Sequence, residues 1–182
     1  MFEQFKTRAE GVSAEVHRFT TEAEALAFLV DFLRTEGVAD APGQYAVVAD
    51  CPFLQSIDRQ QLEEVAGLWL EVTRDRAAAA KVGISQMDWA LADTGTLVQD
   101  ASAIDKRLVS SLPIIHVALI ATSGLLPDMP AWLSEAHPET AGYLAMITGP
   151  SRTADIERVL TIGVHGPERL IIVFVDQLGG TN

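Results

Sequence analysis

Cysteine is almost absent from this sequence, which contains only Cys51. A single thiol cannot form an internal disulfide, so nothing in the sequence calls for an oxidising compartment. One thiolate is also too few for an iron–sulfur cluster or a zinc ribbon held by this chain alone. Because Cys51 follows a predicted strand and precedes Pro52, we expect a buried structural thiol and not a nucleophile.

Basic residues are scarce and nowhere clustered. The chain has 13 Lys and Arg against 25 Asp and Glu, which gives a formal net charge of −12. A nucleic-acid duplex or an anionic membrane would repel such a surface, so we expect no nucleic-acid binding. The four histidines contain no His-x-x-x-His or paired Cys/His spacing. We therefore also expect no bound metal.

Long apolar runs are missing as well. The longest, Leu112–Ala121, is interrupted by Pro113 and His116. It is far shorter than the roughly 20 residues that a membrane-spanning helix needs. The stretch Met1–Gly11 carries charges of both signs and no apolar core, unlike a secretory signal. We expect a cytoplasmic protein without a membrane span.

What the sequence does contain is an alternation of helical and extended patterns along its 182 residues. Thr21 and Glu24 have the spacing of a capping box, followed by an amphipathic helix that ends near Gly37. The uninterrupted apolar run Leu170–Val175 is typical of a strand covered on both faces. This alternation predicts an α/β fold with helices on both sides of a sheet.

The turn Asp93–Gly95 separates two short extended runs and predicts a hairpin, so we expect a mixed, mostly parallel sheet. Residues 1–20 are expected to form a partly helical N-terminal arm, and residues 21–182 a single domain. The other predicted strands are Tyr45–Ala49, Leu68–Val72, Ile114–Ala121 and Leu144–Thr148. The other predicted helices are a short helix around Leu62–Ala66, and the helices Arg76–Val82, Ile104–Ser111, Asp128–Ala136 and Thr153–Ile162.

The clearest candidate site is the segment Ile147–Ile156, which passes from a predicted strand through a loop to a predicted helix start. Free backbone N–H groups and the helix dipole attract anions at such a corner. The guanidinium group of Arg152 adds paired N–H donors that can bind a carboxylate or phosphate. In the alternative, Thr153 is an N-cap and Asp155 complements the dipole. The candidate ligand-binding residues here are Thr148, Gly149, Ser151, Arg152, Thr153 and Asp155.

A second arginine, Arg107, belongs to the few basic residues of the second half of the chain. If it converged with Arg152, the two guanidinium groups would form an anion clamp. The alternative is a solvated residue on a helix.

The segment Asp93-Thr94-Gly95-Thr96 is either a tight turn or a functional loop. In the first case the carboxylate bonds its own backbone. In the second, Asp93 is an acid or base, and Thr94, Gly95 and Thr96 contact a ligand.

Two histidines complete the candidate set. His165 lies in the glycine-containing loop Gly163–Pro167, and its ordinary pKa suits proton transfer near neutrality. Asp93 and His165 are the two candidate catalytic residues. His116 lies inside a predicted apolar strand, where a lone histidine is more often a core residue than a ligand; we keep it among the ligand-binding candidates.

Four segments in this order resemble one known family. They are Trp89–Val98 (WALADTGTLV), Arg107–Pro113 with His116, Ile147–Glu157 (ITGPSRTADIE) and Gly163–Pro167 (GVHGP). The pattern is similar to the LUD domain family, most closely its lactate utilisation protein C branch. The resemblance covers residues 80–176 strongly and the N-terminal part in outline.

The resemblance implies a three-layer α/β/α fold like that of ribose-5-phosphate isomerase and the CoA transferases. It also implies a non-redox subunit in the oxidation of L-lactate to pyruvate, which binds a small carboxylate or other anion. Iron–sulfur clusters would then belong to partner proteins, and this chain would bind no cofactor. Two alternatives stay open: a stand-alone enzyme acting on phosphosugars or CoA esters, and a pure interaction scaffold.

Overall fold

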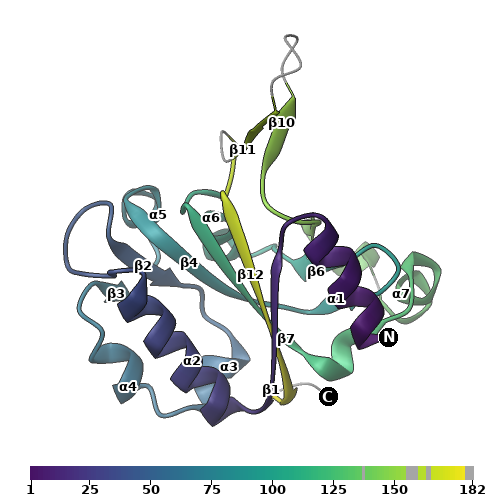
Figure 1. Ribbon diagram of the computed structural model, residues 1–182, viewed down its shortest axis with the longest axis horizontal. Helices are drawn as coiled ribbons and strands as arrows, with labels where there is room; N and C mark the ends of the chain where they lie inside the picture. Colours follow the sequence, from purple (N-terminus) through teal and green to yellow (C-terminus); the bar gives the residue numbers. More distant parts are fainter. Residues whose placement is uncertain (137, 155–159, 163–164, 179–182) are drawn as a thin grey trace.

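The computed structural model describes residues 1–136, 138–154, 160–162 and 165–178 of the chain. Its largest sheet has six strands, all parallel, in the order β1-β12-β7-β4-β2-β3 (Figure 1). The strands are β1 (Glu15–Thr21), β2 (Tyr45–Val48), β3 (Leu68–Trp69), β4 (Ala80–Met87), β7 (Ile115–Ala121) and β12 (Arg169–Gln177).

A second sheet of four strands has the order β8-β5-β6-β9 and contains the predicted hairpin β5–β6. Strands β10 and β11 form a separate antiparallel hairpin, which projects away from both sheets in Figure 1. The strands are β5 (Trp89–Leu91), β6 (Thr96–Asp100), β8 (Leu125–Leu126), β9 (Leu144–Ile147), β10 (Arg152–Ala154) and β11 (Leu160–Ile162).

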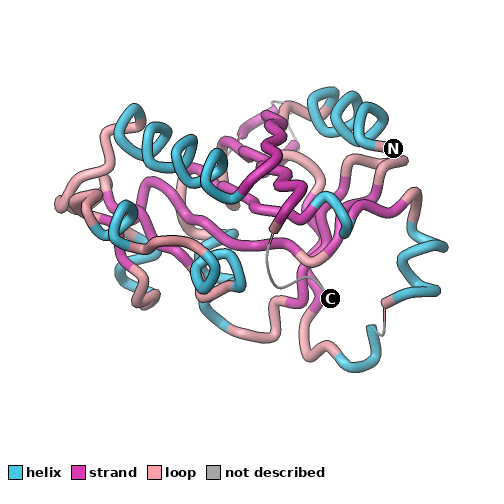
Figure 2. Tube along the Cα trace, turned by 90° about the horizontal axis from the view of Figure 1, so that it is seen from below, coloured by secondary structure: helices cyan, strands magenta, loops and turns pink. Residues whose placement is uncertain are grey.

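Helices cover both faces of the parallel sheet, as the turned view in Figure 2 also shows. They are α1 (Phe2–Gly11), α2 (Glu22–Thr35), α3 (Pro52–Ser56), α4 (Gln60–Glu63), α5 (Arg74–Ala78), α6 (Ile104–Ser111) and α7 (Met129–Glu135), with 3-10 turns η1 (Thr122–Gly124) and η2 (Pro138–Thr140). Among the described residues, none of these helices has the length and apolar character needed to cross a bilayer.

Alternation along the central strands builds the core on both sides of the sheet. In β7, Val117 and Leu119 pack with α2, α3 and α4, whereas Ala118 and Ile120 pack with α1 and the second sheet. The pattern follows from the period of two in a strand. The three-layer α/β arrangement with a mostly parallel sheet confirms the fold class predicted from the sequence.

Several predicted elements are confirmed in detail. Thr21 caps α2: its side-chain oxygen accepts the Glu24 N–H, and the Glu24 carboxylate accepts the Thr21 N–H. Helix α6 has the predicted bounds, and Asp128 caps α7. Strand β12 is buried on both faces from Leu170 to Val175.

Two helix predictions are wrong. The alanine-rich stretch Arg76–Val82 divides between α5 and β4, because the buried centre of the sheet overrides helix propensity. Where a helix was predicted over Thr153–Ile162, residues 153–154 belong to strand β10 and residues 160–162 to strand β11, and residues 155–159 lie outside the described part of the chain. Residues 1–20, expected to be an arm, contain α1 and most of β1, which pairs in parallel with β12 at one edge of the sheet.

Helix α6 lies directly on β4 at Gly83. A Cβ atom added at Gly83 would lie 2.0 Å from the Val109 carbonyl oxygen and 2.8 Å from Pro113 Cγ. Any side chain here would push the helix off the sheet, since real Cβ atoms do not approach backbone oxygens so closely. The glycine therefore sets the height of α6 above the strands.

Glu36, after the end of α2, joins two cations at the amino edge of the sheet. Its carboxylate lies 2.7 Å from Arg169 Nη1 and 3.0 Å from Lys81 Nζ. Burial tends to raise the pKa of Glu36, but the hydrogen bonds from Arg169 and Lys81 outweigh it and hold the pKa below its ordinary value of 4.5.

A carboxyl whose pKa is lowered by folding stabilises the protein above its unfolded pKa, and this contribution is lost as the pH falls toward the folded pKa. Glu36→Gln is therefore expected to lower the free energy of unfolding at pH 7 and to flatten its decline below about pH 4.5. Urea titrations at several pH values check this. As a control, Glu10→Gln removes only an exposed ion pair with Lys6 and should change stability little. If the free energy of unfolding of Glu36→Gln declined below pH 4.5 as steeply as that of the unsubstituted protein, Glu36 would not be the group responsible.

Candidate functional site

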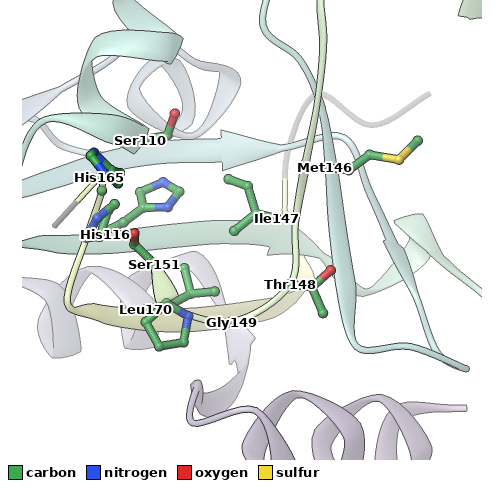
Figure 3. A pocket seen from close by; sticks show the side chains of 12 residues that line it. Ser110, His116, Met146, Ile147, Thr148, Gly149, Ser151, His165 and Leu170 are labelled. Carbon is green, nitrogen blue, oxygen red and sulfur yellow. The ribbon is translucent and has the colours of Figure 1, made fainter. Parts of the chain in front are cut away.

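A cavity of about 310 Å³ lies at the amino ends of β7 and β12. Its walls come from these strands, from the end of α6, and from the loops before β10 and before β12 (Figure 3). The lining residues are Ser110, His116, Met146, Ile147, Thr148, Gly149, Pro150, Ser151, His165, Gly166, Pro167 and Leu170. Five sequence-predicted residues, namely His116, Thr148, Gly149, Ser151 and His165, thus share one cavity.

His116 is the most unusual group in its wall. The side chain is only 1% exposed, and Nε2 lies 2.9 Å from Ser85 Oγ on the neighbouring strand β4. Burial lowers the pKa of His116 to about 4, so the imidazole is neutral at physiological pH. Within the described residues, Nδ1 is buried without a hydrogen-bond partner.

The hydrogen bond between Ser85 and His116 can run in either direction, and its direction sets the tautomer of the ring. When Ser85 Oγ donates to Nε2, Nδ1 carries the ring hydrogen; when Nε2 donates to Ser85, Nδ1 is an acceptor. In both tautomers Nδ1 is a buried polar atom without a partner among the described residues. With Nδ1 protonated, a ligand oxygen that reaches it gains a hydrogen bond.

Two loops are tied together across the cavity mouth. The Ser151 N–H donates to the Pro167 carbonyl at 2.8 Å, which joins the loop before β10 to the loop that carries His165. Gly149 has φ +74°, and a Cβ there would lie 2.7 Å from the Val12 carbonyl oxygen. Only glycine combines this backbone angle with so close an approach. In Figure 3, His116, His165, Ser110 and Ser151 gather on one side of the cavity.

The Asp93–Thr96 turn lies next to the cavity without lining it. Thr96 Oγ1 is 2.8 Å from both Thr94 Oγ1 and Thr148 Oγ1, so a chain of hydroxyls reaches the cavity wall. Gly95 has φ +69° and lies under α1, where a Cβ would be 2.5 Å from the Ala9 nitrogen. Among the described residues, Asp93 Oδ1 is buried without a hydrogen-bond partner.

The structure does not bring Arg107 and Arg152 to the cavity. Arg152 Nη2 donates to the Val12 carbonyl at 2.6 Å and to Ser13 Oγ at 2.7 Å. Arg107 Nη1 donates to the carbonyls of Ala101 and Ser102, and its guanidinium lies over the Tyr143 ring. Each arginine thus braces a loop, and the predicted anion clamp does not form.

The helix start predicted at Thr153 is wrong. Thr153 lies in strand β10, so this residue brings no helix dipole to the cavity. Asp155 lies outside the described residues. Ser85, the partner of His116, was missed because β4 was predicted in part as a helix. Within the part of the chain that the structure describes, no three His, Cys, Asp or Glu side chains gather as a metal site would require.

A family model described as the LUD domain matches residues 2–175. The chain belongs to the LUD domain family. Among its relatives, the lactate utilization protein C of Exiguobacterium sp. is 39% identical over 114 residues, which are 59% of this chain and 50% of that protein. The protein of the same name from Halalkalibacterium halodurans is 35% identical over 126 residues, 66% of this chain and 55% of that protein.

This LUD domain spans about half the length of the curated relatives that it matches. A crystal structure of a DUF162 family protein from Deinococcus radiodurans superposes with a TM-score of 0.65 at 17% identity, covering 96% of this chain and 95% of that chain. The likeness supports the same fold for both chains.

Proposed function

We propose that this LUD domain is a non-redox subunit of a lactate-utilisation system and binds a small carboxylate in the His116 cavity. The names of its relatives support the role in lactate utilisation. Oxidation of lactate to pyruvate removes two electrons and two protons. With a single thiol in the sequence, we assign the electron-carrying iron–sulfur clusters to partner proteins and give this chain the task of holding the acid.

The observation that carries the proposal is the buried Nδ1 of His116, which has no hydrogen-bond partner among the described residues. We assign it the ring hydrogen, with Ser85 donating to Nε2. A carboxylate oxygen placed against it would accept a hydrogen bond from a side chain that is only 1% exposed, and hydrogen bonds to a charged group are stronger than those between neutral groups. The Ser151 hydroxyl provides a second donor from the opposite loop. His165 is exposed in the loop before β12 and is the group in the cavity that can take a proton from the substrate hydroxyl.

Titration calorimetry with L-lactate and pyruvate tests this proposal. We expect binding of both acids, and Ser151→Ala should weaken it about tenfold, the cost of one hydrogen bond to a charged group. Ser134→Ala is the matched control, because among the described residues its exposed hydroxyl donates to the Pro130 carbonyl of the same helix, α7, and it does not line the cavity. Absence of binding, or equal affinity in Ser151→Ala, would remove this site from consideration.

A further inference from the structure

A second, larger cavity of about 460 Å³ lies at the opposite edge of the parallel sheet. It is bordered by the carboxyl end of β4, by residues that follow β2 and β7, by the starts of α3 and β5, and by parts of α6 and α7. The lining residues are Cys51, Pro52, Gln86, Met87, Asp88, Trp89, Lys106, Ser123, Gly124 and Glu135.

The position of this cavity follows from the sheet topology. From β2 the chain continues to β3 on one side, whereas from β4 it continues to β7 on the other side. Strands β2 and β4 are neighbours, so the chain leaves their carboxyl ends in opposite directions. Open parallel sheets leave a crevice at such a point, and ligands bind there across unrelated α/β proteins.

Charges of both signs face this crevice. Asp88 Oδ2 accepts the Asp100 N–H at 2.6 Å, and burial raises the pKa of Asp88. In the described part of the chain this carboxylate has no ion pair. Lys106 Nζ donates one hydrogen bond to the Asp100 carbonyl at 3.0 Å, which leaves two of its hydrogens available. Glu135, at the end of α7, adds a second, exposed carboxylate.

Another part of the wall is apolar, beside the polar residues Gln86 and Ser123. Trp89 is half-buried and packs edge-on against Trp132, with the ring centroids 6.1 Å apart. Met87 and Pro52 extend this surface toward β2. The crevice is therefore bordered by the partly buried carboxylate of Asp88, by the Lys106 ammonium with two available hydrogens, and by an apolar surface. Together they complement a molecule that carries both charges beside a hydrocarbon group.

We propose that this crevice binds a free α-amino acid with an apolar side chain. Lys106 receives the carboxylate, Asp88 and Glu135 receive the ammonium, and the side chain lies against Trp89 and Met87. Charge decides against a simple acid, because two carboxylates and one ammonium leave the crevice net negative in a chain of net charge −12. A zwitterion carries no net charge and satisfies both signs. The site is independent of the His116 cavity and of the role proposed for it.

Calorimetry with three molecules of the same skeleton tests the proposal: L-leucine, its α-hydroxy analogue and 4-methylpentanoate. We expect binding of L-leucine, and at least about tenfold weaker binding when the ammonium is replaced by a hydroxyl or hydrogen. Asp88→Asn and Lys106→Met should each weaken leucine binding about tenfold or more, and Lys106→Arg should retain it. Urea unfolding of each variant, run in parallel, separates lost binding from lost folding.

Ser151→Ala is the matched control from the other cavity and should leave leucine binding unchanged. Conversely, Lys106→Met should leave lactate binding in the His116 cavity unchanged, so failure of one site is distinguishable from failure of the other. Equal or tighter binding of the hydroxy acid, or leucine affinity unaffected by Lys106→Met in a folded protein, overturns the proposal. So does the absence of leucine binding at millimolar concentrations.

Discussion

Replacing Gly83 with alanine is expected to destabilise the chain by about 4 kcal/mol or more, a loss in the extreme range for single substitutions. The added Cβ would meet the Val109 carbonyl oxygen at 2.0 Å, which is a clash with helix backbone and not with a movable side chain. Either α6 lifts from β4 or the strand bends, and both disrupt the packing of Val109 with Ala77 and Ala80. Urea unfolding followed by circular dichroism measures the effect.

Gly11→Ala provides the matched control for this substitution. Gly11 is the last residue of α1, and no atom lies within 4 Å of the position its Cβ would take. The same chemical change there should be neutral or stabilising, by less than about 1 kcal/mol. If Gly83→Ala and Gly11→Ala had similar unfolding midpoints, the close approach of α6 to β4 would not exist in solution.

Phe5→Ala is expected to cost about 3–5 kcal/mol, as for other fully buried aromatic side chains. Phe5 is completely buried, and its ring packs edge-on against Phe174 of β12, with centroids 5.0 Å apart. The substitution should also affect two loops, because α1 covers Gly95 and Val12, just after α1, contacts Gly149. Loss of the Phe5 contact should therefore loosen both loops beside the His116 cavity.

Hydrogen exchange distinguishes this result from uniform destabilisation. In Phe5→Ala, amides of residues 94–96 and 148–151 should exchange faster by a larger factor than those of β2 at the other side of the sheet. Lys6→Ala, on the same helix but partly exposed and paired with Glu10 among the described residues, should change neither stability nor exchange appreciably. Unchanged protection of the two loops in Phe5→Ala would show that α1 does not hold them.

The sequence predicted those elements whose patterns are local. The Thr21–Glu24 capping box, the Asp93–Gly95 turn and the apolar run of β12 are set by neighbouring residues, and all three occur as predicted. The start of strand β4 was predicted wrongly. The alanines 77–80 at and before its first residue favour a helix locally, but pairing with β2 and β7 on both sides makes β4 a central strand.

The candidate site was predictable in part. Loops rich in glycine and hydroxyl residues marked Gly149, Ser151 and His165, which share a cavity with His116. The hydrogen-bond partners of Arg107 and Arg152 were not predictable, because they include backbone carbonyl groups whose positions depend on the whole fold. The Asp88–Lys106 crevice was missed for the same reason, since it exists only where strands far apart in sequence become neighbours.

Helix α6 joins two distant regions of the protein. Its first turn carries Lys106 to the carboxyl edge of the sheet, and its second turn carries Ser110 to the amino edge. Because eight residues make only about two turns, the two positions are parts of one short rigid rod that rests on Gly83. A substitution that lifts this rod off Gly83 is therefore expected to distort both cavities at once, although each of them uses its own side chains for binding.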